Sequence, residues 1–232
     1  MTESINPGDR TAALIDIDGT LVDSTYLHAS AWSSAIRACG FDVPTSRAHR
    51  LIGMQGGRLL EELLGEADAA RVAEQVIDEH ARRFAAVRDQ VAPLPHARDL
   101  LERLVARDVV VVLVSSAERH EVEYYVGLLD AQDLVWASTS AADGSRSKPD
   151  PEPIQIALAR SGCDAAIVIG DSPWDCLAAS AAGLPAVTVL TGGFARSELE
   201  GAGAKAVYEH LGDLADDLDR VGGPVAAHAG AG

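Results

Sequence analysis

Two aspartates stand two positions apart in the segment Asp16-x-Asp18-Gly19-Thr20, where an apolar run at 12–17 ends. Carboxylates with this spacing at the end of a strand can point into one cleft and do different work, because one can attack phosphorus while the other moves protons. A hairpin turn is the other interpretation of Asp18-Gly19. A hairpin leads into a second strand, however, and a segment with helical spacing follows here. The pattern therefore predicts a catalytic site.

Two further polar features lie later in the chain. The pair Ser115-Ser116 follows the apolar run at 109–114 and by itself indicates a turn or a helix N-cap. Lys148 is one of only two lysines, the other being Lys205, among 19 basic residues. A single lysine before proline in a chain rich in arginine suggests a need for a compact point charge, with chance as the alternative. Neither feature identifies a site alone.

A second acidic segment, Gly170-Asp171-Ser172, follows the apolar run at 165–169, and Asp175 comes one helical turn later. Its simplest interpretation is a cap for the next helix. Carboxylate oxygens are also the hard ligands that Mg²⁺ prefers in proteins. The segment becomes informative only if the fold brings it to the first pair of aspartates.

The apolar runs predict how these residues are positioned. They are continuous rather than alternating, as expected for strands that are covered on both faces. Segments with helical spacing separate them, at 100–105 and 122–129 for example. Strand alternating with helix predicts an α/β fold with a Rossmann-like parallel sheet, in which ligands collect at the carboxyl ends of the strands. The predicted strands lie at 12–17, 109–114, 134–137, 165–169 and 186–190.

About 90 residues separate the first two predicted strands, which is too many for one crossover helix. The stripes at 27–39, 59–64 and 72–87 predict helices, the last with His80 and Phe84 on its apolar face. We therefore predict an inserted helical cap domain over residues 24–92. Residues 1–23 and 93–221 form the core in this interpretation. The Gly- and Ala-rich tail, 222–232, is predicted to be disordered.

Taken together, the four polar segments resemble the motifs of the haloacid dehalogenase superfamily, in its branch with a helical cap between the first two strands. The resemblance covers nearly the whole chain, and four separated motifs in the expected order are more specific than any one of them. It implies a Mg²⁺-dependent phosphatase. In the family, the aspartate that matches Asp16 is the nucleophile, and the one that matches Asp18 is the general acid and base.

The resemblance also implies the remaining site residues. Phosphate is expected to meet Ser115, Ser116, Lys148 and the turn at Gly19 and Thr20. The implied ligands of Mg²⁺ are the carboxylates of Asp16 and Asp171 and the main-chain carbonyl of Asp18, with Asp175 as a direct or water-mediated supporter. The aspartyl-phosphate formed on Asp16 is then hydrolysed by water.

The predicted cap offers candidates for contact with the substrate. His28 and Trp32 lie one helical turn apart on the first cap helix, and an ordinary interfacial pair is the alternative. A similar pair in related sugar-phosphate enzymes favours phosphosugars, and phosphoglycolate-like esters remain open. The loop between the cap helices adds four further candidates, Gly53, Met54, Gln55 and Arg58. Arg58 either reads a distal anion or lies solvated at the surface.

Two alternatives remain beside a phosphatase. A β-phosphoglucomutase must hold a sugar bisphosphate, and such enzymes usually place a lysine just before the loop glycine and an arginine shortly after it. Ile52 and Gly56 stand there in this chain, which favours the phosphatase. The other alternative is a catalytically silent phosphate sensor or interaction protein on the same fold, which would have lost Asp16, Asp18 or Lys148.

Composition excludes several kinds of partner. The chain has 232 residues, with 35 acidic and 19 basic side chains and a net charge of −16. This acidity disfavours nucleic acid and anionic membranes, which both require a basic surface. The three cysteines form no metal or disulfide pattern, so we expect buried thiols in a reducing compartment. With no signal peptide pattern at the N-terminus, we predict a cytoplasmic monomer or homodimer acting on a small phosphorylated metabolite.

Overall fold

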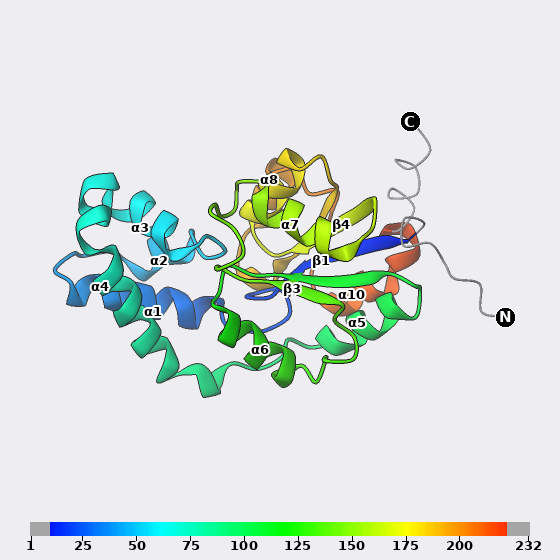
Figure 1. Ribbon diagram of the computed structural model, residues 1–232, viewed down its shortest axis with the longest axis horizontal. Coiled ribbons are helices and arrows are strands. Elements are labelled where there is room, and N and C mark those ends of the chain that lie inside the picture. Colours follow the sequence, from blue (N-terminus) through cyan, green and yellow to red (C-terminus); the bar gives the residue numbers. More distant parts are fainter. Residues whose placement is uncertain (1–9, 222–232) are drawn as a thin grey trace.

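Six parallel strands form one sheet in the computed structural model, which describes residues 10–221. Their order is β3-β2-β1-β4-β5-β6, so the first strand lies near the centre of the sheet (Figure 1). The strands are β1 (Thr11–Asp16), β2 (Val110–Val114), β3 (Ala137–Thr139), β4 (Ala165–Gly170), β5 (Ala186–Val189) and β6 (Ala206–Tyr208). The α/β class predicted from the apolar runs is confirmed. The disorder predicted for 222–232 concerns residues outside the described part.

Helices cover both faces of this sheet, which explains why its strands are continuously apolar. In β1, Ala13 and Ile15 face one apolar cluster, and Ala12 and Leu14 face another. The first cluster is completed by α5 (Ala97–Val105), α6 (Arg119–Leu128) and α10 (Leu211–Asp216). The second is completed by α7 (Glu152–Ser161) and α8 (Pro173–Ala181). Figure 1 shows the two helical layers on opposite sides of the sheet.

Four helices stand between β1 and α5 in the sequence and lie beyond the carboxyl ends of the strands (Figure 1). They share an apolar cluster of their own, around Trp32, Ile36, Leu59 and Leu60. Two chain segments connect them to the core, and these segments pair at Val22 and Pro93. The four helices are α1 (Thr25–Ala38), α2 (Thr45–His49), α3 (Gly56–Leu64) and α4 (Glu66–Ala85).

Two strands differ from the sequence prediction. The third strand begins at Ala137 rather than near residue 134, because the backbone N–H groups of Leu134 and Val135 donate to the carbonyl of Ala131 in a turn. The sixth strand, β6, was not predicted, because it is only three residues long and none of them is fully buried. The remaining short elements are 3₁₀ helices at Arg88–Gln90 and Leu190–Gly192 and the helix α9 (Arg196–Gly201).

The cysteines are free thiols, and only Cys163 and Cys176 are buried. Cys39 is half-buried at the end of α1, so the expectation of three buried thiols was wrong for this one. Within the described residues, none of the helices has the length and the apolar composition needed to cross a bilayer.

Candidate active site

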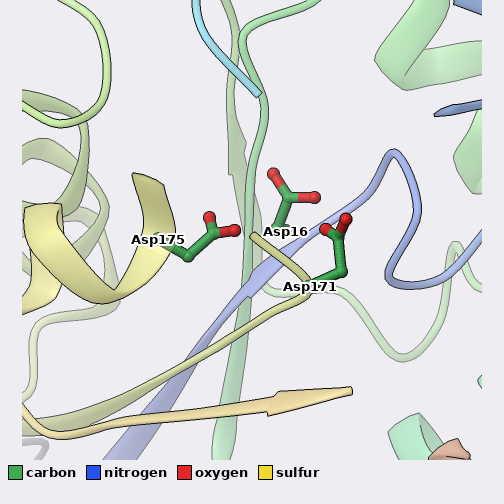
Figure 2. A group of neighbouring side chains, drawn as sticks. All are labelled: Asp16, Asp171 and Asp175. Carbon is green, nitrogen blue, oxygen red and sulfur yellow. The ribbon is translucent and has the colours of Figure 1, made fainter. Parts of the chain in front are cut away.

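Three buried carboxylates from three different elements meet at the carboxyl edge of the sheet. Asp16 ends β1, Asp171 follows β4, and Asp175 lies in the first turn of α8. One oxygen of each lies within 4.8 Å of those of the other two. Figure 2 shows the three side chains approaching one another from separate parts of the backbone. The adjacent position of β1 and β4 in the sheet creates this meeting point.

Lys148 is the cation of this cluster. Its ammonium nitrogen lies 2.5 Å from Asp16 Oδ1 and 2.7 Å from Asp175 Oδ1, and its side chain is 2% exposed. Burial by itself lowers the pKa of Lys148, but the charges of Asp16 and Asp175 outweigh this effect and raise the pKa. The lysine is therefore permanently charged at neutral pH.

Asp175 is fully engaged in holding other groups. Its Oδ2 accepts hydrogen bonds from the Ser172 hydroxyl at 2.6 Å and the Ser172 backbone N–H at 3.2 Å, which caps the start of α8. Its Oδ1 accepts from Lys148. This arrangement fits the supporting role expected for Asp175 better than direct metal ligation, because neither oxygen is left free of a donor.

Asp171 lies against small residues that leave room for its carboxylate. Thr20 Oγ donates to its Oδ1 at 2.9 Å. A Cβ added to Gly19 would lie 2.6 Å from Asp171 Oδ2, and one added to Gly192 would lie 1.7 Å from it. Gly19 also has a φ of +88°, a conformation that residues with a side chain rarely adopt. The Asp18-Gly19-Thr20 turn therefore requires glycine at its centre.

Burial of so much negative charge is electrostatically unfavourable without a further cation. Burial raises the pKa of Asp16 from 3.8 to about 7; Lys148 opposes this rise, while Asp175 and Asp18 add to it. Burial raises the pKa of Asp171 well above 3.8, and the charges of Asp16 and Asp175 add to this rise. The carboxylates of Asp16 and Asp171 offer the hard oxygen donors that a divalent cation prefers, and a single lysine, Lys148, lies among the three acids. The cluster therefore has room in its charge balance for such a cation. The geometry thus fits Asp16 and Asp171 as metal ligands.

Asp18 turns its side chain away from this cluster and toward the helical cap. Ser24 Oγ donates to its Oδ1 at 2.6 Å, and Nε2 of His28 lies 3.3 Å from the same oxygen. Burial alone raises the pKa of Asp18, but the hydrogen bond and charge of His28, then the hydrogen bonds of Ser24 and Tyr125, outweigh it and lower the pKa. The two motif aspartates therefore have different environments and opposite pKa shifts.

Two residues of this network, His80 and Tyr125, were not predicted as site residues. His80 Nε2 lies 3.2 Å from His28 Nδ1, and its ring stacks on Trp32 at 3.9 Å between centroids. The Tyr125 hydroxyl lies 3.4 Å from His28 Nε2. The sequence placed both on apolar helix faces but gave no signal for their contact with His28, which lies 52 and 97 positions away. A polar ring on an apolar face is the only hint the sequence offers.

A cavity of about 420 Å³ opens between the core and the cap. Asp16 and Asp18 line its catalytic end, and His28, Trp32 and Ser116 line its walls. Most of the predicted cap candidates lie here as well. Gln55 also bridges the two parts, since its side-chain amide donates to the Ala141 carbonyl at 3.2 Å. The loop residues that line the cavity are Gly53, Met54 and Gln55, and they are followed by Gly56 and Gly57 at the start of α3.

Of the two interpretations of Arg58, the structure fits the solvated surface residue rather than a residue that reads an anion in this cavity. Its guanidinium pairs with Glu61 and Glu62 on the solvent side of α3, and its side chain is 51% exposed. Acidic residues three and four positions further along a helix lie on the same face as the arginine, which explains this pairing. Arg50 is also engaged elsewhere, with Glu198 and the ring of Phe194.

Ser115 lies at the end of β2, next to the charged cluster, and is buried. Its hydroxyl oxygen accepts a hydrogen bond from the Ala117 backbone N–H at 3.0 Å, so its proton is free to donate. Ser115, Ser116 and Lys148 also line a small pocket beside the catalytic cluster. The structure therefore places every predicted phosphate-binding residue at one edge of the sheet, around Asp16.

Comparison with known proteins identifies a family and several related enzymes. The family model described as haloacid dehalogenase-like hydrolase matches residues 13–189. The chain is 31% identical to the validoxylamine A 7'-phosphate phosphatase of Streptomyces hygroscopicus subsp. limoneus, over 77% of this chain and 85% of that protein. It is 28% identical to the phosphoglycolate phosphatase of Rhodospirillum rubrum, over 89% of this chain and 90% of the relative.

Solved structures agree in fold. A hydrolase from Pseudomonas syringae superposes with a TM-score of 0.86 at 33% identity, covering 91% of this chain and 99% of that one. A putative β-phosphoglucomutase from Bacteroides vulgatus superposes with a TM-score of 0.79, covering 93% and 90%. At 21% identity, the second likeness shows the fold alone.

Proposed function

The chain belongs to the haloacid dehalogenase-like hydrolases, and on that premise we propose that it is a Mg²⁺-dependent phosphatase that dephosphorylates a small phosphorylated metabolite through an aspartyl-phosphate on Asp16. The observation that carries the proposal is the convergence of Asp171 and Lys148 on Asp16, which lines a cavity large enough for a substrate. The relatives named as phosphatases support the same reaction class.

Asp16 is placed to attack the phosphorus atom in line with the departing alcohol. A phosphate monoester is a dianion, so a carboxylate attacks it only where positive charge offsets the repulsion. Lys148, 2.5 Å from Asp16, supplies one such charge, and the Ser115 hydroxyl is placed to donate to a phosphoryl oxygen. Mg²⁺ held by the Asp16 and Asp171 carboxylates and the Asp18 carbonyl would add positive charge beside the phosphoryl oxygens.

Asp18 handles the protons. Its lowered pKa suits the second half of the reaction, in which it accepts a proton from the water that hydrolyses the aspartyl-phosphate. In the first half a proton must be present at Asp18 for the departing alkoxide. His28, whose Nε2 is 3.3 Å from the Asp18 carboxylate, is placed to share one. The helical cap excludes bulk water from the first half.

The alternatives are less well supported. A mutase needs cations for a second phosphate at the cap end of the cavity. Arg50 and Arg58 are paired with acids elsewhere, which leaves Arg88 as the one arginine or lysine in the described lining. A catalytically silent sensor is expected to lack catalytic groups, yet Asp16, Asp18 and Lys148 are present and in contact with partners. We also place the reaction in the cytoplasm, since the three cysteines are free thiols, and expect a monomer or homodimer.

Hydrolysis of p-nitrophenyl phosphate with and without Mg²⁺ tests this function. We expect turnover that requires Mg²⁺ and a loss of about 10⁴-fold or more in the Asp16→Asn variant, because the nucleophile is removed while its shape is retained. Asp42→Asn, an exposed acid in the α1–α2 connection, is the matched control and should leave the rate unchanged. Activity of the folded Asp16→Asn protein within tenfold of the parent would contradict the assignment.

A further inference from the structure

The catalytic cavity has one face that is apolar and aromatic. Its volume of about 420 Å³ lies in the range of pockets that hold whole ring-bearing ligands, roughly 300–1,000 Å³. A two-carbon alcohol such as that of phosphoglycolate would leave most of this space unfilled. The apolar wall on the cap side suits the flat face of a ring, and it is made of Trp32, Ile52, Met54, Ile77 and Phe84.

The cap side of the cavity offers little positive charge. In the described part of the chain, Arg88 is the one arginine or lysine in the lining, and its guanidinium lies 4.5 Å above the ring of Tyr124. His80 also lines the cavity. Burial lowers its pKa to about 3, and the charge of His28 adds to this effect, so the ring is neutral. Within the described residues, a second anion on the substrate would therefore find Arg88 as its single arginine or lysine, on the side of the cavity where that guanidinium lies over Tyr124 rather than on the apolar wall.

Negative charge faces that wall instead. Glu118 and Glu121, at the start of α6, both line the cavity. Glu121 is half-buried, and burial, opposed by the charge of His28 and aided by that of Asp18, raises its pKa. A hydrogen bond from the Glu118 backbone occupies only part of its acceptor capacity. The basic groups that act on it most are His28 and His120 rather than an arginine or lysine.

We propose that the substrate is a phosphate ester of a ring-bearing, hydroxylated alcohol that carries a protonated amine and no second anion, with Glu121 as the residue that selects it. This inference rests on the proposed phosphatase function. The ring lies against the Trp32 wall, and its phosphate reaches Asp16. An ammonium group across the ring supplies a permanent cation to Glu121, which no arginine or lysine of the described residues pairs with. A carboxylate or second phosphate at the same place meets Glu118 and Glu121 as like charges.

Three six-carbon pyranose 1-phosphates separate these cases. Glucosamine 1-phosphate carries an amine, glucose 1-phosphate has no charge beyond its phosphate, and glucuronic acid 1-phosphate carries a carboxylate. At pH 7 and saturating Mg²⁺ we expect kcat/KM to fall in that order. The amine should gain about tenfold over the hydroxyl, and the carboxylate should lose at least tenfold, as expected for single partly buried charge contacts.

Glu121→Gln distinguishes a selecting residue from a structural one, because glutamine keeps an acceptor for the helix cap while removing the charge. The variant should erase the preference for the amine over the hydroxyl and improve the relative rate of glucuronic acid 1-phosphate. Glu123→Gln, on the exposed face of the same helix and outside the cavity, is the matched control and should keep the parent ranking.

The outcomes separate this inference from the proposed function. If the parent hydrolyses p-nitrophenyl phosphate but prefers the carboxylate, ranks all three equally, or turns over none of them, the inference is wrong and the phosphatase function stands. The same conclusion follows if Glu121→Gln retains the parent ranking. If the parent fails to hydrolyse p-nitrophenyl phosphate with Mg²⁺, the proposed function itself fails.

Discussion

The two ends of the catalytic cavity are built differently. At the core end, the charged groups hold one another through short contacts, as Lys148 does with Asp16 at 2.5 Å and with Asp175 at 2.7 Å. At the cap end, stacked rings replace ion pairs: His80 lies on Trp32 at 3.9 Å, and His28 lies on Phe84 at 3.7 Å. The core end is therefore held by buried charges, and the cap end is lined mainly by aromatic rings.

This difference corresponds to a division of labour. A phosphoryl group is the same in every substrate, so the groups that meet it can be fixed by buried charge. An alcohol differs from one substrate to another, and aromatic or apolar walls with a few polar groups set which alcohol fits. Substitutions at the core end should therefore change the rate with every substrate, whereas substitutions at the cap end should change the ranking of substrates.

The largest effect is expected from Lys148→Met. The variant removes the cation shared by Asp16 and Asp175, and we expect kcat/KM to fall about a thousandfold with every phosphate ester. Without Mg²⁺ at pH 7.5 it should also lower the free energy of unfolding by about 3 kcal/mol, because two buried carboxylates lose their partner. Urea unfolding and steady-state kinetics measure the two effects.

Lys205 is the natural control for this variant, since it is the only other lysine and is exposed. Lys205→Met should match the parent in both measurements. A thousandfold loss that affects only one class of alcohol would break the comparison, because it would place Lys148 in substrate selection.

The next effect concerns metal and pH. The pKa values of Asp16 and Asp171 are raised in the folded protein, that of Asp16 to about 7, mainly by burial. A carboxyl with a raised folded pKa contributes stability below its unfolded pKa of 3.8, and this contribution is lost as the pH rises through the folded pKa. The metal-free protein should therefore lose stability between pH 4 and pH 7.

Mg²⁺ should reverse this loss, because it binds the ionised carboxylates. At a hundred times the dissociation constant the gain is about 2.7 kcal/mol, which corresponds to several degrees in Tm for a chain of this size. We expect the gain in thermal unfolding to grow from pH 5 to pH 7.5 and to vanish in Asp171→Asn. A gain of equal size at both pH values would contradict the ligand assignment.

The core end was predictable from the sequence, and the cap end only in part. Asp16, Asp18 and Asp171 stand directly at or after apolar runs, and a parallel sheet brings the ends of neighbouring strands together whatever the loops do. The motif residues therefore inherit their positions from strand order. The three-residue strand β6 carries too few apolar positions to predict.

At the cap end, position depends on how helices pack, which the spacing along one helix does not reveal. His80 was assigned to a buried helix face, but its partner His28 lies on a different helix. For Arg58 the sequence analysis left two interpretations open, a reader of a distal anion or a solvated surface residue, although Glu61 and Glu62 stand at the spacings that pair with it on the surface. That local signal was present in the sequence and would have decided between them.

A smaller effect is expected from Tyr125→Phe, which tests the boundary between the two ends. The variant removes only the hydroxyl that lies 3.4 Å from His28 Nε2 and helps to lower the pKa of Asp18. We expect kcat to fall about tenfold, as for other groups that orient a catalytic residue, with KM nearly unchanged.

Tyr124→Phe is the control for this variant. It removes the hydroxyl of the neighbouring residue, which points to the Arg88 carbonyl, and should leave kcat as it is. A rise in KM without a loss of kcat would assign Tyr125 to the alcohol rather than to Asp18.

The smallest effect is expected from Arg58→Gln, and a small effect is the result that places Arg58 outside substrate recognition. Both ion pairs of Arg58 are exposed and connect residues within α3, so each contributes about 0.5 kcal/mol or less to stability. The guanidinium lies outside the cavity lining, and we therefore expect kcat/KM to stay within about twofold for amine-bearing, neutral and anionic sugar phosphates alike. Steady-state kinetics with the three pyranose 1-phosphates measures this directly.

A selective loss of tenfold or more with the anionic ester would mean that Arg58 reaches the substrate when the cap closes. The cap end would then carry a second arginine besides Arg88, and the contrast between the two ends of the cavity would no longer hold.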